Sequence, residues 1–321
     1  MPHWLIKSAA QRVISWLPNS QWWNEQFQRH VTRSLEHDVE SFEMRVRLAE
    51  RYVAAWSSAN PGRSGPFTAL ELGTGWFPVV PICLWLCGVD KVWTYDIVPL
   101  IDRDRLAATF GRFVEWRDRN ALSHLLPSAM TVRVSQLAAL SERAKSEDPV
   151  ALLGSMGIHV RVQDARHTDL APASVDVFTS SAVLEYIPRP AIAGLFAEFR
   201  RVARAGAVSS HYINLADQYH YFDRSISPLN FLRFSEGQWR IFNSPLTPLN
   251  RLRHSDYQAL LRDGGWRIIA DEPDRGTAAD LDRVPLAEAF RRYEQQDLLV
   301  LTVFISAQLE PSENVASAPR G

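Results

Sequence analysis

The chain has 321 residues, of which 46% are hydrophobic and 22% are charged, with 35 Lys and Arg against 36 Asp and Glu. A chain of this length buries roughly 75% of its unfolded surface, which is enough for one large domain with extensions. The formal net charge of −1 argues against nucleic acid as a partner, because neutralising phosphates requires a surplus of cations. Two cysteines, Cys83 and Cys87, stand four positions apart. They predict a reduced, cytoplasmic protein without a metal site rather than a disulfide framework.

Residues 1–66 predict a helical N-terminal extension or lid. A helix over 4–17 has an apolar stripe, a second helix is expected over 32–56, and a loop rich in Pro and Gly ends the extension at 60–66. No stretch reaches the ~20 apolar residues of a membrane span, and no signal peptide is expected. The first helix is either a lid packed on the mouth of a ligand site or an interfacial helix in weak contact with a membrane surface. Its stripe consists of Leu5, Ile6, Ala9, Val13, Trp16 and Leu17.

From Phe67 onward, strands and helices alternate. The strand over 67–72, a helix over 78–86 and the strand over 91–97 form a βαβ unit. The interval before the next strand is too long for one crossover helix, so a helical insertion is expected at about 100–155. An aromatic-rich segment at about 211–253 predicts a cap, Ser255 is expected to cap a short helix, and the tail 309–321 is expected to be disordered. The remaining predicted elements are strands over 158–162, 175–179, 207–214, 266–270 and 298–306 and a helix over 190–204.

The ends of four predicted strands carry the residues that suggest chemistry. Glu71-Leu72-Gly73-Thr74-Gly75 follows the first strand, and glycines there let a backbone approach a ligand closely. Asp96 ends the second strand, 21 residues after Gly75. Gln163-Asp164-Ala165 follows the third strand, and Val183-Leu184-Glu185-Tyr186-Ile187 follows the fourth.

Together these motifs resemble the class I S-adenosylmethionine-dependent methyltransferases. The resemblance implies an α/β fold over residues 67–308, with a Rossmann-like seven-stranded, mostly parallel sheet, helices on both faces and an antiparallel last strand. It implies S-adenosylmethionine as cofactor, with a ribose contact from Asp96 and an adenine contact from Asp164. This sequence departs from the family at Phe77, where a third glycine is usual. The implied cofactor residues are Glu71, Gly73, Thr74, Gly75, Asp96, Ile97, Asp164, Ala165 and Ser181.

The methyl acceptor is expected to be a small molecule or a sugar- or lipid-linked intermediate. Methyl transfer from a sulfonium is an in-line displacement, and a hydroxyl acceptor also needs a base. His211 and Tyr212 lie at the end of the fifth predicted strand, His220 follows it, and these three residues are the catalytic candidates. Two alternatives stay open: a nucleotide-dependent oxidoreductase, whose fingerprint would want a glycine at Pro78, and a non-catalytic S-adenosylmethionine-binding protein. The oligomeric state is not predicted.

Overall fold

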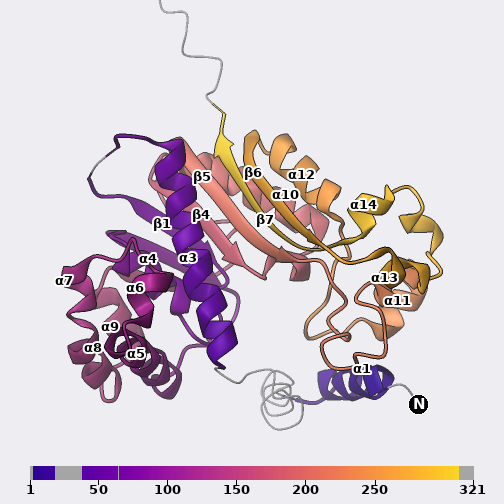
Figure 1. Ribbon diagram of the computed structural model, residues 1–321, viewed down its shortest axis with the longest axis horizontal. Coiled ribbons are helices and arrows are strands. Elements are labelled where there is room, and N and C mark those ends of the chain that lie inside the picture. The colour runs from indigo at the N-terminus through magenta and orange to yellow at the C-terminus, as the bar shows by residue number, and fades with distance from the viewer. Residues whose placement is uncertain (1–2, 19–37, 64, 311–321) are drawn as a thin grey trace, which may run out of the picture.

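The computed structural model describes residues 3–18, 38–63 and 65–310, and a twisted sheet runs through its centre (Figure 1). The seven strands lie in the order β3-β2-β1-β4-β5-β7-β6, and β7 is antiparallel to both of its neighbours. The predicted α/β fold, including its antiparallel last strand, is therefore confirmed. The strands are β1 (Thr68–Leu72), β2 (Lys91–Asp96), β3 (Ile158–Val162), β4 (Val175–Ser181), β5 (Ala203–Asn214), β6 (Trp266–Arg275) and β7 (Val300–Leu309).

The strand order reverses between β1 and β4, which lie side by side although about 100 residues separate them in the sequence. Along β1, Ala69 packs into the apolar cluster on one face of the sheet, and Leu70 packs into the cluster on the other face. Both faces are covered, so β1 is a continuous apolar run rather than an alternating one.

Helices α3 (Val39–Ala59) and α4 (Val79–Leu86) cover one face of the sheet, and α10 (Arg189–Val202) and α12 (His254–Asp263) cover the other (Figure 1). The side chain of Asp38 caps α3 by accepting a hydrogen bond from the backbone N–H of Ser41 at 2.5 Å. The buried side of α3 carries an apolar seam, namely Phe42, Val46, Ala49, Val53 and Trp56. The helix predicted as part of an extension is thus a layer of the main core; its predicted start at Thr32 lies outside the described residues.

Five short helices fill the long interval between β2 and β3, where the sequence predicts a helical insertion. Their apolar residues join the cluster under α3 and α4, so the insertion extends one core rather than forming its own. Asp102 and Asp148 cap the first and last of these helices through side-chain hydrogen bonds. The helices are α5 (Arg103–Asp118), α6 (Ala121–Leu125), α7 (Thr131–Val134), α8 (Leu137–Ala144) and α9 (Pro149–Ser155).

A separate apolar cluster lies beyond the carboxyl ends of the strands, at the right of Figure 1. We call this part, residues 215–253 and 276–299, the cap lobe. The sequence predicts only its first segment; the second joins because Val284, Phe290 and Leu298 pack with Trp239. Helix α1 (His3–Ser15) packs on this lobe. The other short elements are η1 (Leu184–Tyr186), η2 (Asn230–Arg233), α11 (Glu236–Phe242), α13 (Ala278–Asp282), η3 (Glu288–Phe290) and α14 (Gln295–Leu298).

The N-cap of helix α12 lies two residues earlier than predicted. This cap is Arg253, whose backbone N–H donates to Asp256, and the predicted cap Ser255 instead bonds the carboxylate of Asp297 in the cap lobe. A tertiary partner has therefore replaced the local capping interaction. Within the described ranges, no helix combines the length and apolarity needed to cross a bilayer. The predicted disordered tail falls almost wholly outside those ranges.

Candidate functional site

A cavity of about 550 Å³ lies at the carboxyl edge of the sheet, beside the reversal of strand order. Open α/β sheets bind ligands in such a crevice. The tips of β1, β2, β3 and β4 all contribute to its wall, and α1 contributes no residue to it. All nine residues predicted for the cofactor line this cavity: Glu71, Gly73, Thr74, Gly75, Asp96, Ile97, Asp164, Ala165 and Ser181.

The turn after β1 brings backbone to the cavity wall. Gly73 has φ +84° and Gly75 has φ +66°, in the left-handed region that favours glycine. A Cβ on Gly73 would lie 2.4 Å from Cγ2 of Val183, whereas a Cβ on Gly75 would meet nothing within 4 Å. Gly73 is thus required by conformation and by the close approach of Val183, and Gly75 by conformation alone.

Asp96 ends β2 and faces this turn. Its Oδ2 accepts a hydrogen bond from the backbone N–H of Gly75 at 3.1 Å, and its Oδ1 accepts one from that of Val98 at 3.3 Å. Burial raises the pKa of the carboxyl, and these backbone donors oppose the rise. Each oxygen retains a lone pair, so the carboxylate can accept two further hydrogen bonds from a ligand in the cavity.

Glu71 supplies a buried carboxyl on the α3 side of the cavity. The hydroxyl of Thr94 donates to its Oε2 at 3.4 Å, and the hydroxyls of Thr74 and Thr94 lie 2.6 Å apart. Burial raises the pKa of Glu71 well above its usual value, and the guanidinium of Arg45 opposes that rise. A carboxyl and a guanidinium therefore face one space, and the cavity presents both charge signs to a ligand.

The sequence analysis misses the contribution of α3. Ser41 and Arg45 line the cavity, and the guanidinium of Arg45 donates back to the Ser41 carbonyl at 3.2 Å. Both residues fall within the segment interpreted as an extension. The available signal is that Arg45 directly precedes Val46, a residue of the apolar seam, so it lies near the face that packs on the sheet.

Asp164 follows β3 and lies at the cavity rim. Its carboxylate forms a bidentate pair with Arg166, whose Nε donates to Oδ1 at 3.0 Å and whose Nη2 donates to Oδ2 at 2.5 Å. These hydrogen bonds lower the pKa of Asp164. The half-exposed carboxylate is already engaged by Arg166, so a ligand would share it with this arginine.

The fourth strand tip is tied to α3. The hydroxyl of Tyr52 donates to the backbone carbonyl of Ser180 at 2.8 Å and lies 3.0 Å from Oγ of Ser181. Tyr52 is fully buried and its ring stacks on that of Phe304 at 5.6 Å. This contact fixes Ser181 at the cavity wall and links the position of α3 to the site.

Aromatic residues stand where the related family has its third glycine. Trp76 and Phe77 line the cavity, and Pro78 precedes the first residue of α4 as its cap. The guanidinium carbon of Arg105 lies 4.2 Å from the centre of the Trp76 ring, a cation–π contact with the insertion. The mouth of the cavity is therefore bulkier than a glycine turn would make it.

His211 does not border the cavity, which corrects the prediction that it is a catalytic base. The side chain points from β5 toward α10, where it is fully buried beside the rings of Phe196 and Phe199. Nδ1 lies 2.8 Å from the hydroxyl of Ser180, and Nε2 lies 2.7 Å from that of Ser209. Burial lowers the pKa of His211 to about 3. The pleat of β5 turns this residue into the core, and both ring nitrogens are satisfied there.

Replacing His211 by alanine should therefore destabilise the fold by about 3 kcal/mol, because it removes a buried ring and strands two hydroxyls. Urea unfolding measures this loss. Titration calorimetry with S-adenosylhomocysteine, at a temperature where the variant stays folded, should give wild-type affinity. If His211→Ala had wild-type stability but transferred the methyl group more slowly, His211 would have a role in the reaction.

Tyr212 and His220 are also absent from the cavity wall. Tyr212 pairs with Phe304 of β7 and faces the α3 side of the sheet, because neighbouring positions of a strand point to opposite faces. Nδ1 of His220 lies 2.7 Å from the carbonyl of Ile226 inside the cap lobe. Tyr186, in the segment after β4, does line the cavity; the related family commonly has histidine at this position.

One family model matches part of this chain, and solved structures of methyltransferases are similar to it. Residues 111–209 match a family model described as a methyltransferase domain, a span from α5 to β5 that excludes the glycine turn. No curated protein sequence gives a significant match. A methyltransferase from Methanosarcina mazei is 15% identical with a TM-score of 0.42, covering 77% of this chain and 94% of its own. Geranyl diphosphate C-methyltransferase from Streptomyces coelicolor A3(2) is 13% identical with a TM-score of 0.43, covering 81% and 79%.

The fold and its cavity define an α/β protein that binds a ligand at the switch point of a mostly parallel sheet. The chain therefore contains a methyltransferase domain over residues 111–209, as the resemblance to the class I S-adenosylmethionine-dependent methyltransferases implies. It is an enzyme of the transferase class, so the alternatives of a nucleotide-dependent oxidoreductase and a non-catalytic binding protein are not supported.

Proposed function

We propose that the cavity is the S-adenosylmethionine site and that the enzyme methylates a small-molecule or a sugar- or lipid-linked acceptor. The observation that carries the proposal is the convergence of four strand tips, with all nine predicted residues, on one cavity. Its volume of about 550 Å³ suits a ligand of nucleoside size. When bound, the cofactor supplies an electrophilic methyl group on sulfur.

Each group in the wall has a counterpart in the cofactor. Asp96 has lone pairs to accept hydrogen bonds from ribose hydroxyls, and the open side of Gly75 admits the ligand close to the backbone. Asp164, held by Arg166, borders the half of the cavity left for the adenine. Glu71 and Arg45 offer opposite charges, as the ammonium and carboxylate of the amino-acid half require.

The residues near the mouth of the cavity indicate what kind of methyl acceptor the enzyme takes. Trp76, Phe77 and Tyr186 give an aromatic wall, which supports an acceptor with apolar surface. No histidine lines the cavity among the described residues, and its carboxyl groups Glu71, Asp96 and Asp164 are assigned above to the cofactor, so no general base is assigned to the acceptor. Alignment of the acceptor and exclusion of water would supply the catalysis.

We also propose a cytoplasmic location. Cys83 on α4 and Cys87 at its C-cap are buried, unpaired thiols, and burial raises the pKa of each, so the protonated, less reactive form is favoured. This pair suits a reducing compartment.

Substitution of Asp96 by asparagine tests the cofactor assignment. We expect wild-type protein to bind S-adenosylhomocysteine at micromolar concentrations, about −8 kcal/mol, and the variant to lose about 1.5–3 kcal/mol. Asparagine can still accept the hydrogen bond from Gly75 through its amide oxygen, so the turn is expected to survive. Titration calorimetry gives the affinities, and tritiated-methyl transfer into aqueous or lipid extracts then separates free from lipid-linked acceptors.

The matched control is Asp118→Asn on α5, an exposed aspartate outside the cavity that pairs with Arg117. It should bind as the wild type does. If the wild type, Asp96→Asn and Asp118→Asn bound S-adenosylhomocysteine with equal affinity, Asp96 would not contact the cofactor. The proposed orientation of the cofactor would then be wrong as well.

A further inference from the structure

Helix α1 carries most of its apolar stripe on the side that faces solvent, and Leu5 is the member of the stripe that packs against the cap lobe. The sequence predicts that this stripe packs inward or meets a membrane; in the structure Trp4, Ser8 and Gln11 face the cap lobe instead. The outward side presents Ile6 at 55% exposure, Val13 at 54% and Trp16 at 75%, together with Ala9 and Leu17. Amphipathic helices of soluble domains show the opposite arrangement, so this helix has an apolar face without a partner in the described structure.

Polar contacts hold the helix in this orientation. The Ser8 hydroxyl donates to the carbonyl of Phe242 at 2.9 Å, and the Arg12 guanidinium donates to the carbonyl of Ile241 at 2.7 Å. The backbone N–H of Trp4 donates to the Asp223 carboxylate at 3.2 Å, and its ring contacts that of Tyr219. Rotating the stripe inward would break these bonds, so its exposure follows from specific contacts.

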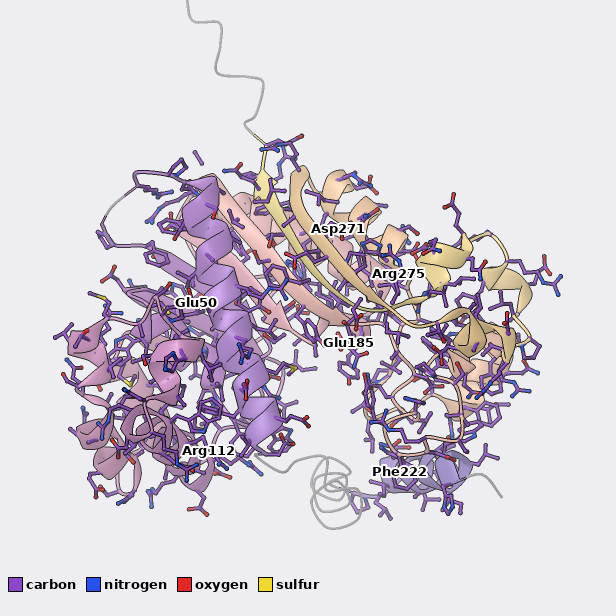
Figure 2. The ribbon with its side chains drawn as sticks, in the orientation of Figure 1. Glu50, Arg112, Glu185, Phe222, Asp271 and Arg275 are labelled. Atoms are coloured by element: carbon purple, nitrogen blue, oxygen red, sulfur yellow. The ribbon has the colours of Figure 1, made fainter. Side chains whose placement is uncertain are left out.

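The cap lobe continues the apolar surface beside α1. Phe222 lies at this end of the molecule in Figure 2, and Nζ of Lys7 is 5.1 Å from the centre of its ring. Ile241 is exposed next to the carbonyl contacts of Arg12. We call the set formed by Ile6, Ala9, Val13, Trp16, Leu17, Phe222 and Ile241 the apolar end face.

The charge around the apolar end face is positive although the whole chain is nearly neutral. The sequence has no Asp or Glu before Glu25, and α1 contributes Lys7 and Arg12. In the adjoining part of the cap lobe, both acidic side chains between residues 219 and 243 are engaged: Asp223 by Ser225 and Trp4, and Glu236 by Arg251. Three exposed arginines lie in the same segment without a carboxylate partner among the described residues, namely Arg224, Arg233 and Arg240.

We propose that the apolar end face docks the enzyme on the surface of an anionic lipid bilayer. An exposed tryptophan and aliphatic residues suit burial at the boundary of headgroups and acyl chains, and flanking Lys and Arg are attracted to anionic headgroups. Positive charge at the rim favours a lipid surface over a second copy of the chain, because two copies would bring like charges together.

Docking would also orient the cavity. Ser41, which lines the cavity, lies at the N-terminal end of α3, and that end and α1 lie on the same lower side of Figure 1. The bilayer would therefore lie on the same side of the molecule as the end of α3 that carries Ser41. This suits the lipid-linked acceptor proposed above, but the docking does not depend on the cofactor assignment.

Vesicle co-sedimentation of the full chain tests the docking. Vesicles of phosphatidylcholine with 30% phosphatidylglycerol, a composition of about one anionic lipid in three, should bind the wild type, with weaker binding to phosphatidylcholine alone and at high salt. The variant Val13→Ser/Trp16→Ser should bind at least about ten-fold more weakly. The matched control is Val132→Ser/Val150→Ser, which changes two valines on the insertion that are 59% and 50% exposed; it should bind as the wild type does.

Thermal melting establishes that both variants stay folded, as expected for exposed positions. Sedimentation velocity identifies the main competing occupant. If the wild type fails to bind anionic vesicles, or the control loses as much binding as the Val13/Trp16 variant, the proposal is overturned. A wild-type dimer that Val13→Ser/Trp16→Ser converts to monomer, without lipid binding, would assign the apolar end face to self-association instead.

Discussion

Replacing Gly73 by alanine should destabilise the protein by about 2–4 kcal/mol and abolish measurable binding of S-adenosylhomocysteine. The left-handed backbone at φ +84° costs an L-residue about 1–2 kcal/mol, and the new Cβ would lie 2.4 Å from Cγ2 of Val183. Relieving that overlap moves the turn or the segment after β4, at a further 1–3 kcal/mol. Both segments line the cavity, so stability and binding fall together. Urea unfolding and calorimetry measure the two effects.

Two companion variants separate the backbone cost from the overlap. Gly75→Ala has a similar left-handed φ but open space around the new Cβ, so it should show only the conformational cost. Val183→Ala combined with Gly73→Ala should recover part of the stability, which gives a coupling free energy of about 1 kcal/mol or more in a double-mutant cycle. Equal losses for Gly73→Ala and Gly75→Ala would contradict the role of Val183.

Glu185 gives the second large effect, on the pH dependence of stability. The residue lies where the strand tips meet the cap lobe (Figure 2), and it is almost fully buried. No described side chain donates a hydrogen bond to either carboxyl oxygen. Burial raises the pKa of Glu185 to about 8, only partly opposed by nearby backbone N–H groups, including that of Asn214. The folded protein therefore keeps a proton that the unfolded chain releases above about pH 4.5.

Stability should fall as pH rises from about 5 to 8, because the unfolded state binds fewer protons than the folded state in that interval. Glu185→Gln removes this pH-dependent contribution to the free energy of unfolding. The variant should therefore become more stable than the wild type as pH rises, by about 3 kcal/mol near pH 8. A neighbouring cavity of about 10 Å³, lined by Asn214 and Asn250, has room for one water to serve the new amide. Urea midpoints at pH 5, 6, 7 and 8 measure the difference.

The control is Glu142→Gln, at an exposed glutamate on α8. Its stability should follow the wild type at every pH. Asp217, whose pKa burial raises to about 7, should leave a residual slope of the same sign in Glu185→Gln. Parallel curves for wild type and Glu185→Gln would mean that Glu185 is ionised in the folded protein.

The local sequence determined the sheet and the residues around the cavity. Short strand-like runs rich in apolar residues precede Gly73, Asp96 and Asp164, and such runs are readable because strands in the middle of a parallel sheet are covered on both faces. All strand tips of one direction meet at one edge of the sheet, so residues far apart in sequence could be grouped before their positions were known.

Only the tertiary structure decided which side chains of β5 and α3 face the cavity. His211 and Tyr212 are neighbours on one strand, and the pleat sends the first into the core under α10 and the second toward α3. Arg45 reaches the cavity because α3 packs on the sheet through Tyr52, a contact between residues 128 positions apart. Such contacts depend on packing between distant segments, which local periodicity does not encode.

The orientation of α1 is another feature that only the tertiary structure decided. The sequence determined that residues 4–17 form a helix with an apolar stripe, since the spacing of Ile6, Val13 and Leu17 places them on one side. Which side packs inward was decided by carbonyl groups of the cap lobe that accept hydrogen bonds from Ser8 and Arg12. An apolar stripe makes its own burial favourable. The tertiary contacts determine whether the stripe is buried against the protein or is left to be buried in another phase.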